Sequence, residues 1–315
     1  MRMDVQGYST ERYNRAGASE LLERLGAEPL LVQGPMGTVL MSEPGGEDIP
    51  AAVWNVAEPK TVERVHALYR AAGAEVMLTN TFQASAPALA RDRVPRDVAE
   101  LNRAGVDCAR RAGATMLLGS MGPCGVTWML EDSREYREAR AAYRDQAYAL
   151  LDAGVDGLLL ETFTSVRDFD PAITGVFDVA DGMPVIASFV VNEKGDLLGD
   201  GLNIEAAVLM AEQRGAFGVG VNCCSLQAAT EAVPRMAAAT KLPIMVRPNA
   251  GDPHRDEDGM LAWDEDPEAF AACAARWVRD GAAAIGSCCG TTARTTCALS
   301  EALFSIASQA AGLHS

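Results

Sequence analysis

The chain has 315 residues, of which 49% are hydrophobic and 22% are charged, and its formal net charge is −16. This composition is ordinary for a globular protein, and the length suits one large domain or two smaller ones. The acidic balance argues against nucleic acids and anionic membrane surfaces as partners, because both bind basic protein surfaces. Residues 1–17 contain no apolar export segment and no apolar run is long enough to span a membrane, so we expect a soluble, cytoplasmic protein.

Short apolar runs recur along the chain, and many of them end in small polar or thiol residues. Continuous apolar runs of this length are typical of parallel strands that are covered on both faces. The eight predicted strands lie at residues 30–34, 76–82, 115–122, 157–163, 184–191, 218–224, 243–251 and 283–290.

Amphipathic segments such as 59–74 and 133–155 separate the predicted strands, and many end in a helix-capping glycine. The polar segment 252–266 is interpreted as a solvated loop, or alternatively as a gate over the site. It leads into a helix start at Asp266. Eight strand–helix repeats favour a single (β/α)8 barrel. We expect one domain over residues 1–315, with 1–18 as an N-terminal extension and 305–315 as a tail.

The active site of a (β/α)8 enzyme lies at the C-terminal ends of the strands. Polar and thiol side chains gather at those ends in this sequence. They are Gln33, Thr79, Asn80, Ser120, Glu161, Thr162, Asn222, Cys223, Asn249, Cys288 and Cys289.

The chain has eight cysteines, and in a reducing compartment clustered cysteines indicate metal binding or catalysis rather than disulfides. The pairs Cys223-Cys224 and Cys288-Cys289 end the sixth and eighth predicted strands, so their thiols can converge on one ion. Three thiolates with an open fourth position suit a catalytic Zn²⁺. Such an ion can hold a substrate thiol as the thiolate, which is a nucleophile for methyl transfer. Buried cysteines that pack against the barrel are the alternative.

Several motifs together resemble the homocysteine S-methyltransferase family. GSCCGTT (286–292) resembles its Gly-Cys-Cys-Gly-Thr signature, and GVNCC (220–224) resembles its Gly-(Val/Ile)-Asn-Cys strand. The resemblance runs in order from about residue 30 to about residue 295 and implies the same barrel and thiol methylation. Further matches lie in 54–85, GSMGP (119–123), ETFTS (161–165) and PNAG (248–251).

The resemblance implies that Cys223, Cys288 and Cys289 are zinc ligands. Cys224 follows the ligand on the sixth predicted strand and points away from it if the strand alternates, so Cys224 is interpreted as a bystander. The resemblance also implies that Glu161 receives the ammonium group of homocysteine through a charge-assisted hydrogen bond. The other candidate substrate-binding residues are Gln33, Thr79, Asn80, Ser120 and Asn222. Cys124 has no family counterpart and is expected to serve packing, as are Cys108, Cys273 and Cys297 in Ala-rich helical segments.

The first-strand motif departs from the family pattern. The family has Asp-Gly-(Gly/Ala)-x-(Gly/Ala)-Thr where this chain has Gln33-Gly34-Pro35-Met36-Gly37-Thr38. An amide can accept a hydrogen bond but carries no charge, and losing a charged partner typically costs about 1.5–3 kcal/mol. Either Glu161 alone holds the amino group, or the acceptor is not homocysteine.

The leading hypothesis is a zinc-dependent methyltransferase that converts homocysteine to methionine. No cobalamin- or folate-binding module is evident, so we expect a free donor such as S-methylmethionine, S-adenosylmethionine or a betaine. The TNTF and PNAG motifs also resemble the methionine synthase barrel, and a separate corrinoid protein that carries methylcobalamin is therefore the second hypothesis. A non-catalytic zinc- or thiol-binding protein is a further alternative. A cysteine-nucleophile hydrolase is disfavoured because His66, His254 and His314 offer no convincing base.

Overall fold

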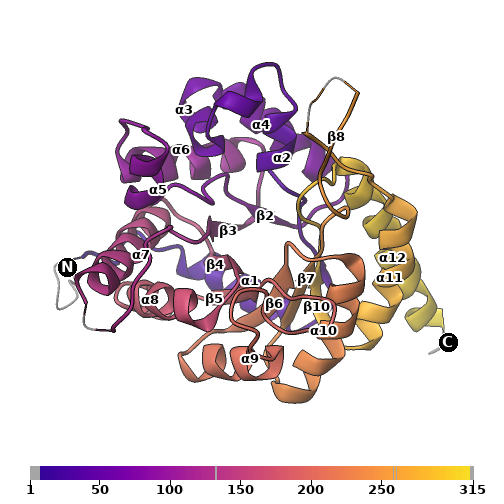
Figure 1. The fold of residues 1–315 in the computed structure, drawn as a ribbon. Helices are drawn as coiled ribbons and strands as arrows, with labels where there is room; N and C mark the ends of the chain where they lie inside the picture. Colours follow the sequence, from indigo (N-terminus) through magenta and orange to yellow (C-terminus); the bar gives the residue numbers. More distant parts are fainter. Residues whose placement is uncertain (1–7, 132, 258, 260, 313–315) are drawn as a thin grey trace.

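The computed structural model describes residues 8–131, 133–257, 259 and 261–312. Eight parallel strands form one sheet in the order β1-β10-β7-β6-β5-β4-β3-β2, with helices around the outside (Figure 1). The two ends of this order meet, because Val32, just after β1, forms a parallel bridge with Val76 of β2. The predicted (β/α)8 barrel is therefore confirmed.

The strands begin close to the predicted positions, and all except β4, which matches its predicted range, are shorter than the predicted apolar runs. The residues at the end of most runs leave the sheet and form the loops that carry the site. The strands are β1 (Leu30–Leu31), β2 (Val76–Leu78), β3 (Met116–Met121), β4 (Gly157–Phe163), β5 (Val185–Phe189), β6 (Gly218–Asn222), β7 (Ile244–Arg247) and β10 (Ala282–Ile285).

The longer helices begin at side-chain caps that the sequence supplies. Ser133, Ser165, Asn203, Ser225 and Asp266 each accept a hydrogen bond from a backbone N–H in the first turn of a helix. The α-helices are α1 (Arg15–Leu25), α2 (Gly37–Met41), α3 (Trp54–Ala57), α4 (Pro59–Ala71), α5 (Ala86–Arg91), α6 (Val98–Arg111), α7 (Arg134–Asp152), α8 (Val166–Phe177), α9 (Ile204–Gln213), α10 (Leu226–Ala239), α11 (Pro267–Arg279) and α12 (Ala293–Gly312). Short 3-10 turns at Gly46–Asp48 (η1) and Ala51–Val53 (η2) shape the segment after α2.

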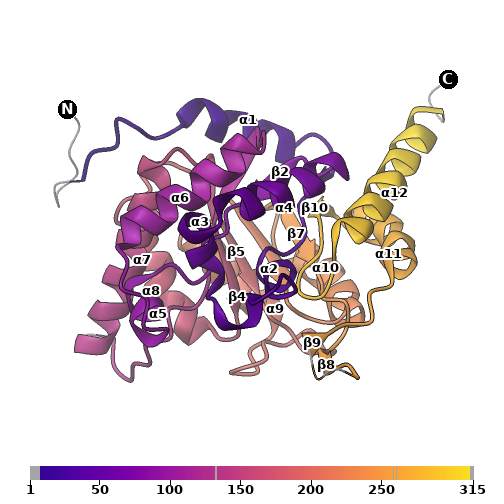
Figure 2. The ribbon, with the colours of Figure 1, turned by 90° about the horizontal axis from the view of Figure 1, so that it is seen from above.

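The two ends of the barrel differ. Leu21 and Leu25 of α1 belong to the same buried cluster as inward-facing strand residues such as Leu30, Leu118 and Met245. Helix α1 thus closes the end where the strands begin, and Figure 2 shows it across that end. The opposite end stays open to the loops that follow the strands. Within the described part of the chain, no helix combines the length and apolarity needed to cross a bilayer.

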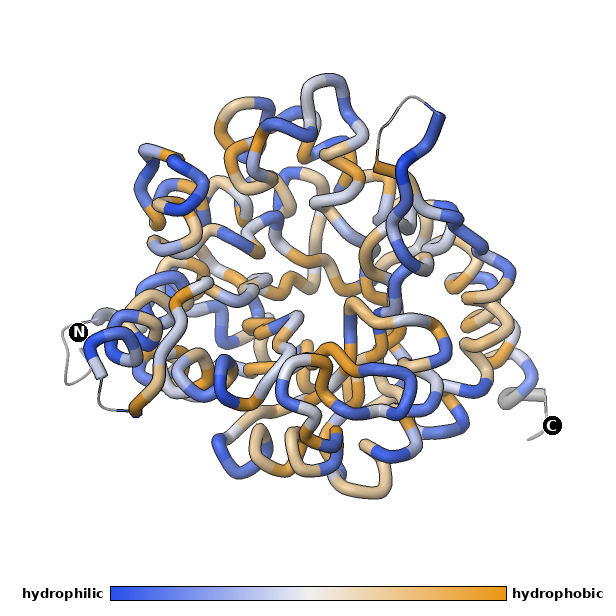
Figure 3. Tube along the Cα trace, in the orientation of Figure 1, coloured by the Kyte–Doolittle hydropathy of each residue, from blue (hydrophilic) through white to orange (hydrophobic). Residues whose placement is uncertain are grey.

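The polar segment 252–266 is exposed at most of its described residues, as expected for a solvated loop. It also contains a short antiparallel hairpin, β8 (His254–Arg255) with β9 (Leu261–Ala262), which stands out from the barrel in Figure 1 and is hydrophilic at β8 in Figure 3. Cys108 is buried as expected, but Cys273 is half-buried and Cys297 is exposed. The last two lie on α11 and α12, and small apolar residues do not by themselves show which face of an outer helix is covered.

Candidate active site

A cavity of about 680 Å³ opens at the C-terminal ends of the strands. Its polar lining includes Cys223, Cys288, Cys289, Glu161 and Arg247, which come from four different strand ends. The segment after β1, together with Phe82, supplies much of the apolar lining. The apolar residues are Pro35, Met36, Met41, Ile49, Pro50, Ala51, Ala52, Leu78 and Phe82.

The three cysteines converge. Sγ of Cys223 lies 3.2 Å from Sγ of Cys288 and 3.7 Å from Sγ of Cys289, and all three sulfurs lie within 4.8 Å of one another. A tetrahedral zinc with Zn–S bonds of about 2.3 Å separates its sulfur ligands by about 3.8 Å. Three thiols at separations near this value are a donor set that suits zinc.

The backbone around these thiols is tightly constrained. Cys223 has φ of 54°, a left-handed conformation that residues with a side chain rarely adopt. The backbone N–H of Cys288 donates to the carbonyl of Pro248 at 2.7 Å, and Ala250 donates to the carbonyl of Cys289 at 2.9 Å. The loops after β7 and β10 thus hold each other, and this interlocking fixes the direction of the two adjacent thiols.

The thiols differ in their affinity for protons. Hydrogen bonds from Cys223 and Cys289 lower the pKa of Cys288 well below its usual value, and the charge of Arg247 adds to this effect. The same contacts raise the pKa of Cys223. Cys224 belongs to the hydrophobic core instead, where burial raises its pKa to about 12. Its packing agrees with the role of bystander.

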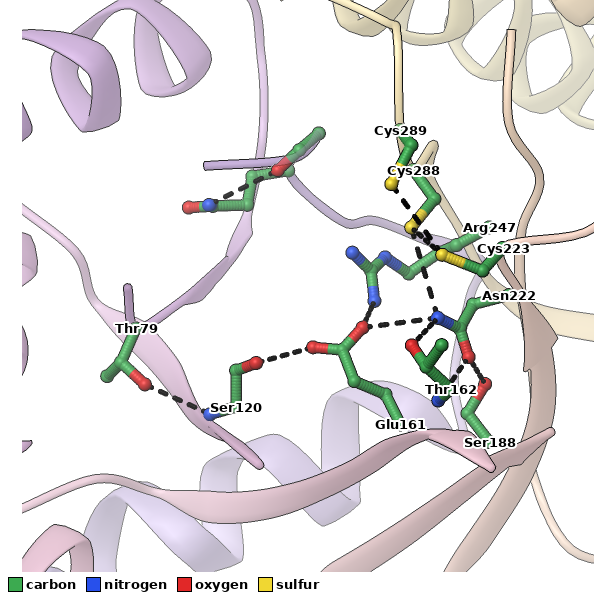
Figure 4. A network of polar contacts seen from close by, with 12 residues as sticks. Thr79, Ser120, Glu161, Thr162, Ser188, Asn222, Cys223, Arg247, Cys288 and Cys289 are labelled. Carbon is green, nitrogen blue, oxygen red and sulfur yellow. Dashed lines mark hydrogen bonds and ion pairs between the residues drawn. The ribbon is translucent and has the colours of Figure 1, made fainter. Parts of the chain in front are cut away.

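Glu161 and Arg247 form a buried ion pair beside the cysteines. Nη1 of Arg247 lies 2.7 Å from Oε2 of Glu161, and the two side chains are 3% and 6% exposed. Burial alone would lower the pKa of Arg247, but the charges of Glu161, Cys288 and Cys223 and the hydrogen bond to Glu161 together outweigh burial and raise the pKa. Ser120 donates to Oε1 of Glu161 at 2.5 Å. Figure 4 shows the guanidinium between the Glu161 carboxylate and the cysteine sulfurs.

Asn222 connects this ion pair to the cysteines. Its Nδ2 lies 3.4 Å from Oε2 of Glu161 and 3.9 Å from Sγ of Cys288. Its Oδ1 accepts hydrogen bonds from Ser188 and from the backbone N–H of Thr162, which has a left-handed φ of 69°. Asn222 does not line the cavity itself, so it positions the groups that do.

Three further candidate substrate-binding residues line the cavity, and each makes hydrogen bonds to other groups of the protein. The hydroxyl of Thr79 forms a hydrogen bond with the hydroxyl of Thr81 and accepts one from the backbone N–H of Ser120. Asn80 donates to the carbonyl of Ala51 at 2.6 Å and so fixes the segment after β1. Gln33 donates to the carbonyl of Gly34.

The remaining polar candidates contribute less to the cavity. Asn249 is not part of the lining. No histidine of the described residues lines it either, since His66 is fully buried and His254 is exposed on the hairpin. His314 lies outside the described residues. The hydrolase alternative thus finds no base at the thiols among these histidines.

Arg247 was not among the residues predicted from the sequence. A signal was available, because a charged residue inside the apolar run 243–251 must be paired if the strand is buried. Its partner Glu161 lies 86 residues earlier, and periodicity carries no information about pairing across such a distance.

Comparison with known proteins identifies the family of this chain. The homocysteine S-methyltransferase family model matches residues 30–303. The chain is 31% identical over 298 residues to the homocysteine S-methyltransferase of Escherichia coli, covering 86% of this chain and 94% of that protein. It is 30% identical over 296 residues to the methionine synthase of Mycobacterium leprae, covering 87% of this chain but 24% of that protein.

The fold has a solved counterpart. The crystal structure of the homocysteine methyltransferase MmuM from Escherichia coli, metallated form, matches with a TM-score of 0.73 and 24% identity, covering 90% of this chain and 99% of that one. This likeness shows a shared barrel. The family match spans the strand ends that carry the thiols and Glu161. The chain therefore belongs to the homocysteine S-methyltransferase family of methyltransferase enzymes.

Proposed function

We propose that the protein is a zinc-dependent S-methyltransferase that methylates the thiol of homocysteine and releases methionine. The observation that carries this proposal is the convergence of Cys223, Cys288 and Cys289 on one wall of a cavity of about 680 Å³. A cavity of that volume lies within the range of about 300–1,000 Å³ that is typical of small-molecule sites. Zinc bound to the three thiols would hold the acceptor thiol as its thiolate near neutral pH.

The reaction itself is a displacement at carbon. The acceptor sulfur forms a bond to the methyl carbon while the bond between that carbon and the donor heteroatom breaks. The bonding electrons leave with the donor, and the thiol proton passes to solvent. The chain's task is to align the two reactants, which converts a bimolecular step into one within a single complex.

The apolar lining supports this role. Pro35, Met36, Ile49, Pro50 and Phe82 line the cavity that also holds the thiols. An apolar wall keeps water from competing with the thiolate for the methyl group and binds the uncharged parts of a donor. Glu161, Arg247 and Ser120 belong to the polar part of the lining, and we assign them to the acceptor side.

Two donor classes are compatible with this site. A free donor such as S-methylmethionine, S-adenosylmethionine or a betaine can enter the open end of the cavity. A separate corrinoid protein is the second candidate, favoured by the similarity to methionine synthase, of which the chain spans about a quarter of the length.

One assay tests the proposal and separates the donors. Zinc-loaded protein is incubated with homocysteine and each free donor, and in parallel with methylcobalamin and a methylcobalamin-loaded protein, and methionine is measured by mass spectrometry. We expect methionine with one donor class and none after chelation of the metal. Zinc-loaded, folded protein that forms no methionine with any donor would contradict the proposal.

A further inference from the structure

The most informative group in the cavity is the buried guanidinium of Arg247, and the inference drawn from it rests on the proposed thiol methylation. Arg247 ends β7 and is 2% exposed, yet it lines the cavity. In the described part of the chain its guanidinium makes one side-chain hydrogen bond, from Nη1 to Glu161, and its buried Nε has no partner. Because a guanidinium has five N–H donors, most of them remain available.

Glu161, in contrast to Arg247, already uses both carboxylate oxygens in hydrogen bonds. Its Oε1 accepts from Ser120 at 2.5 Å, and its Oε2 accepts from Arg247 at 2.7 Å and faces Nδ2 of Asn222 at 3.4 Å. Both oxygens are engaged, and the charge of the carboxylate is already balanced. The pair as a whole therefore offers unused donors and few unused acceptors.

A second cation at Glu161 would be disfavoured by this arrangement. An ammonium group on Oε2 would share one oxygen with the guanidinium, and like charges at such separations repel strongly where water is excluded. Gln33, which also lines the cavity, is neutral and adds no negative charge beside the ion pair. The other acidic residues of the lining are Glu47 and Asp48 of η1 and Asp92 at the end of α5, and none of them pairs with Arg247. The surroundings of Arg247 and Glu161 therefore suit an anion better than an ammonium group.

We propose that the acceptor thiol is recognised through an acid group that binds Arg247, and that an amino group contributes little. The substrate class is a short thiol with a carboxylate, in which homocysteine and mercapto acids without an amino group are alike. A guanidinium binds a carboxylate through two parallel N–H bonds, which also orients the bound molecule. Glu161 is then a positioning residue that holds Arg247 in place.

The placement of the thiols supports a single molecule reaching both groups. Asn222 touches both Glu161 and Cys288, at 3.4 Å and 3.9 Å. The ion pair and the cysteines thus both lie within reach of one side chain. A thiol and an acid joined by a chain of three carbons can span such a gap, with the sulfur at the cysteines and the acid at Arg247.

The test measures binding by calorimetry, so that it does not depend on the methyl donor. Zinc-loaded protein is titrated with homocysteine, with 4-mercaptobutyrate, which lacks the amino group, and with 3-aminopropane-1-thiol, which lacks the acid. We expect 4-mercaptobutyrate to bind nearly as well as homocysteine. The aminothiol should bind about 10- to 100-fold more weakly, as expected for the loss of a charge-assisted hydrogen bond.

Variants connect this preference to Arg247. Because R247M alone leaves Glu161 unpaired, the informative protein is the double variant R247M/E161Q, in which the preference for acid-bearing thiols should disappear. R110M is the matched control. It breaks a second ion pair, Arg110 with the buried Asp156, which lies before β4 at the closed end of the barrel, and the preference should persist.

The outcomes separate this inference from the proposed function. Tighter binding of the aminothiol than of 4-mercaptobutyrate would overturn the inference and make Glu161 the receptor of an ammonium group. Loss of the acid preference in R110M would also overturn it. Acid-selective binding without methyl transfer from any donor would leave the inference standing and contradict the proposed function alone.

Discussion

Nδ1 of His66 lies 3.2 Å from Oε1 of Gln33, and both side chains are fully buried. His66 is on α4 and Gln33 follows β1. This contact therefore joins helix α4 to the residue that departs from the family motif. Gln33 also donates to the carbonyl of Gly34. The amide therefore has a structural task of its own, since it gives Nδ1 of a buried imidazole its one hydrogen-bond partner among the described residues.

The first prediction concerns pH. Burial lowers the pKa of His66 to about 3, whereas an unfolded histidine has a pKa of about 6.5. The unfolded state therefore binds a proton first as the pH falls, so stability from this group is complete above pH 6.5 and is lost below it. From pH 7 to pH 5 the loss amounts to about 2 kcal/mol.

The measurement compares urea unfolding of the wild-type protein and His66→Gln at pH 7 and pH 5. Glutamine can still donate to Gln33 and does not titrate in this range. The variant should lose less stability on acidification than the wild type. Identical pH dependence in the two proteins would show that His66 is accessible to protons in the folded state.

The second prediction concerns the family motif. Gln33→Asp adds a negative charge to the cavity lining and restores the residue type of the family pattern. If Arg247 binds the acid of the acceptor, the new charge should favour an acceptor with an amino group over one without. The ratio of kcat/KM for homocysteine to that for 4-mercaptobutyrate should rise by about tenfold or more, the value of a charge-assisted hydrogen bond.

Two other results are informative for Gln33→Asp. An unchanged ratio would place Gln33 away from the acceptor's amino group. Equal loss with both thiols, together with a lower midpoint of thermal unfolding, would show that the contact with His66 dominates.

The barrel could be predicted because eight apolar runs alternate with amphipathic helical segments along the sequence. The convergence of the cysteines could be predicted because they end two strands that lie close to each other in a barrel. The pairing of Arg247 with Glu161 and that of Gln33 with His66 could not be predicted in this way. Both depend on the side-chain directions of distant residues, and neither hydropathy nor spacing encodes those directions.

The third prediction concerns the metal. Cys288→Ala and Cys289→Ala should each remove most of the zinc from a protein that we expect to hold about one ion per chain, because the proposed ligand set consists of three thiolates. Cys224→Ala is the control, since its thiol packs in the core. Its zinc content, measured by plasma mass spectrometry, should match the wild type. Full zinc in the Cys223, Cys288 and Cys289 variants would refute the site.

The fourth prediction concerns the buried ion pair. Glu161→Gln keeps the shape of the side chain but leaves the guanidinium of Arg247 without its counter-charge. Removing one partner of a buried pair typically costs about 3–5 kcal/mol, and we expect a lower midpoint of urea unfolding. Zinc content should remain near that of the wild type, because Glu161 is not a ligand. Loss of zinc with unchanged stability would contradict this role.

The last prediction concerns Gly290, the residue after Cys289. Its φ is 81°, and a Cβ there would lie 2.2 Å from Cγ of Trp263. Gly251 has a similar φ of 77°, but a Cβ there would have no atom within 4 Å. Gly251→Ala should therefore cost only the backbone strain of a left-handed alanine, about 1–2 kcal/mol.

Gly290→Ala should cost more than Gly251→Ala, because the methyl group meets the base of the indole rather than a flexible end. Since a displacement of the Gly290 backbone moves the adjacent Cys289, zinc affinity should fall in Gly290→Ala and not in Gly251→Ala. Unfolding midpoints and competition with a zinc chelator measure the two effects. If both variants lose equal stability and keep equal zinc affinity, the contact with Trp263 plays no part in holding the thiol.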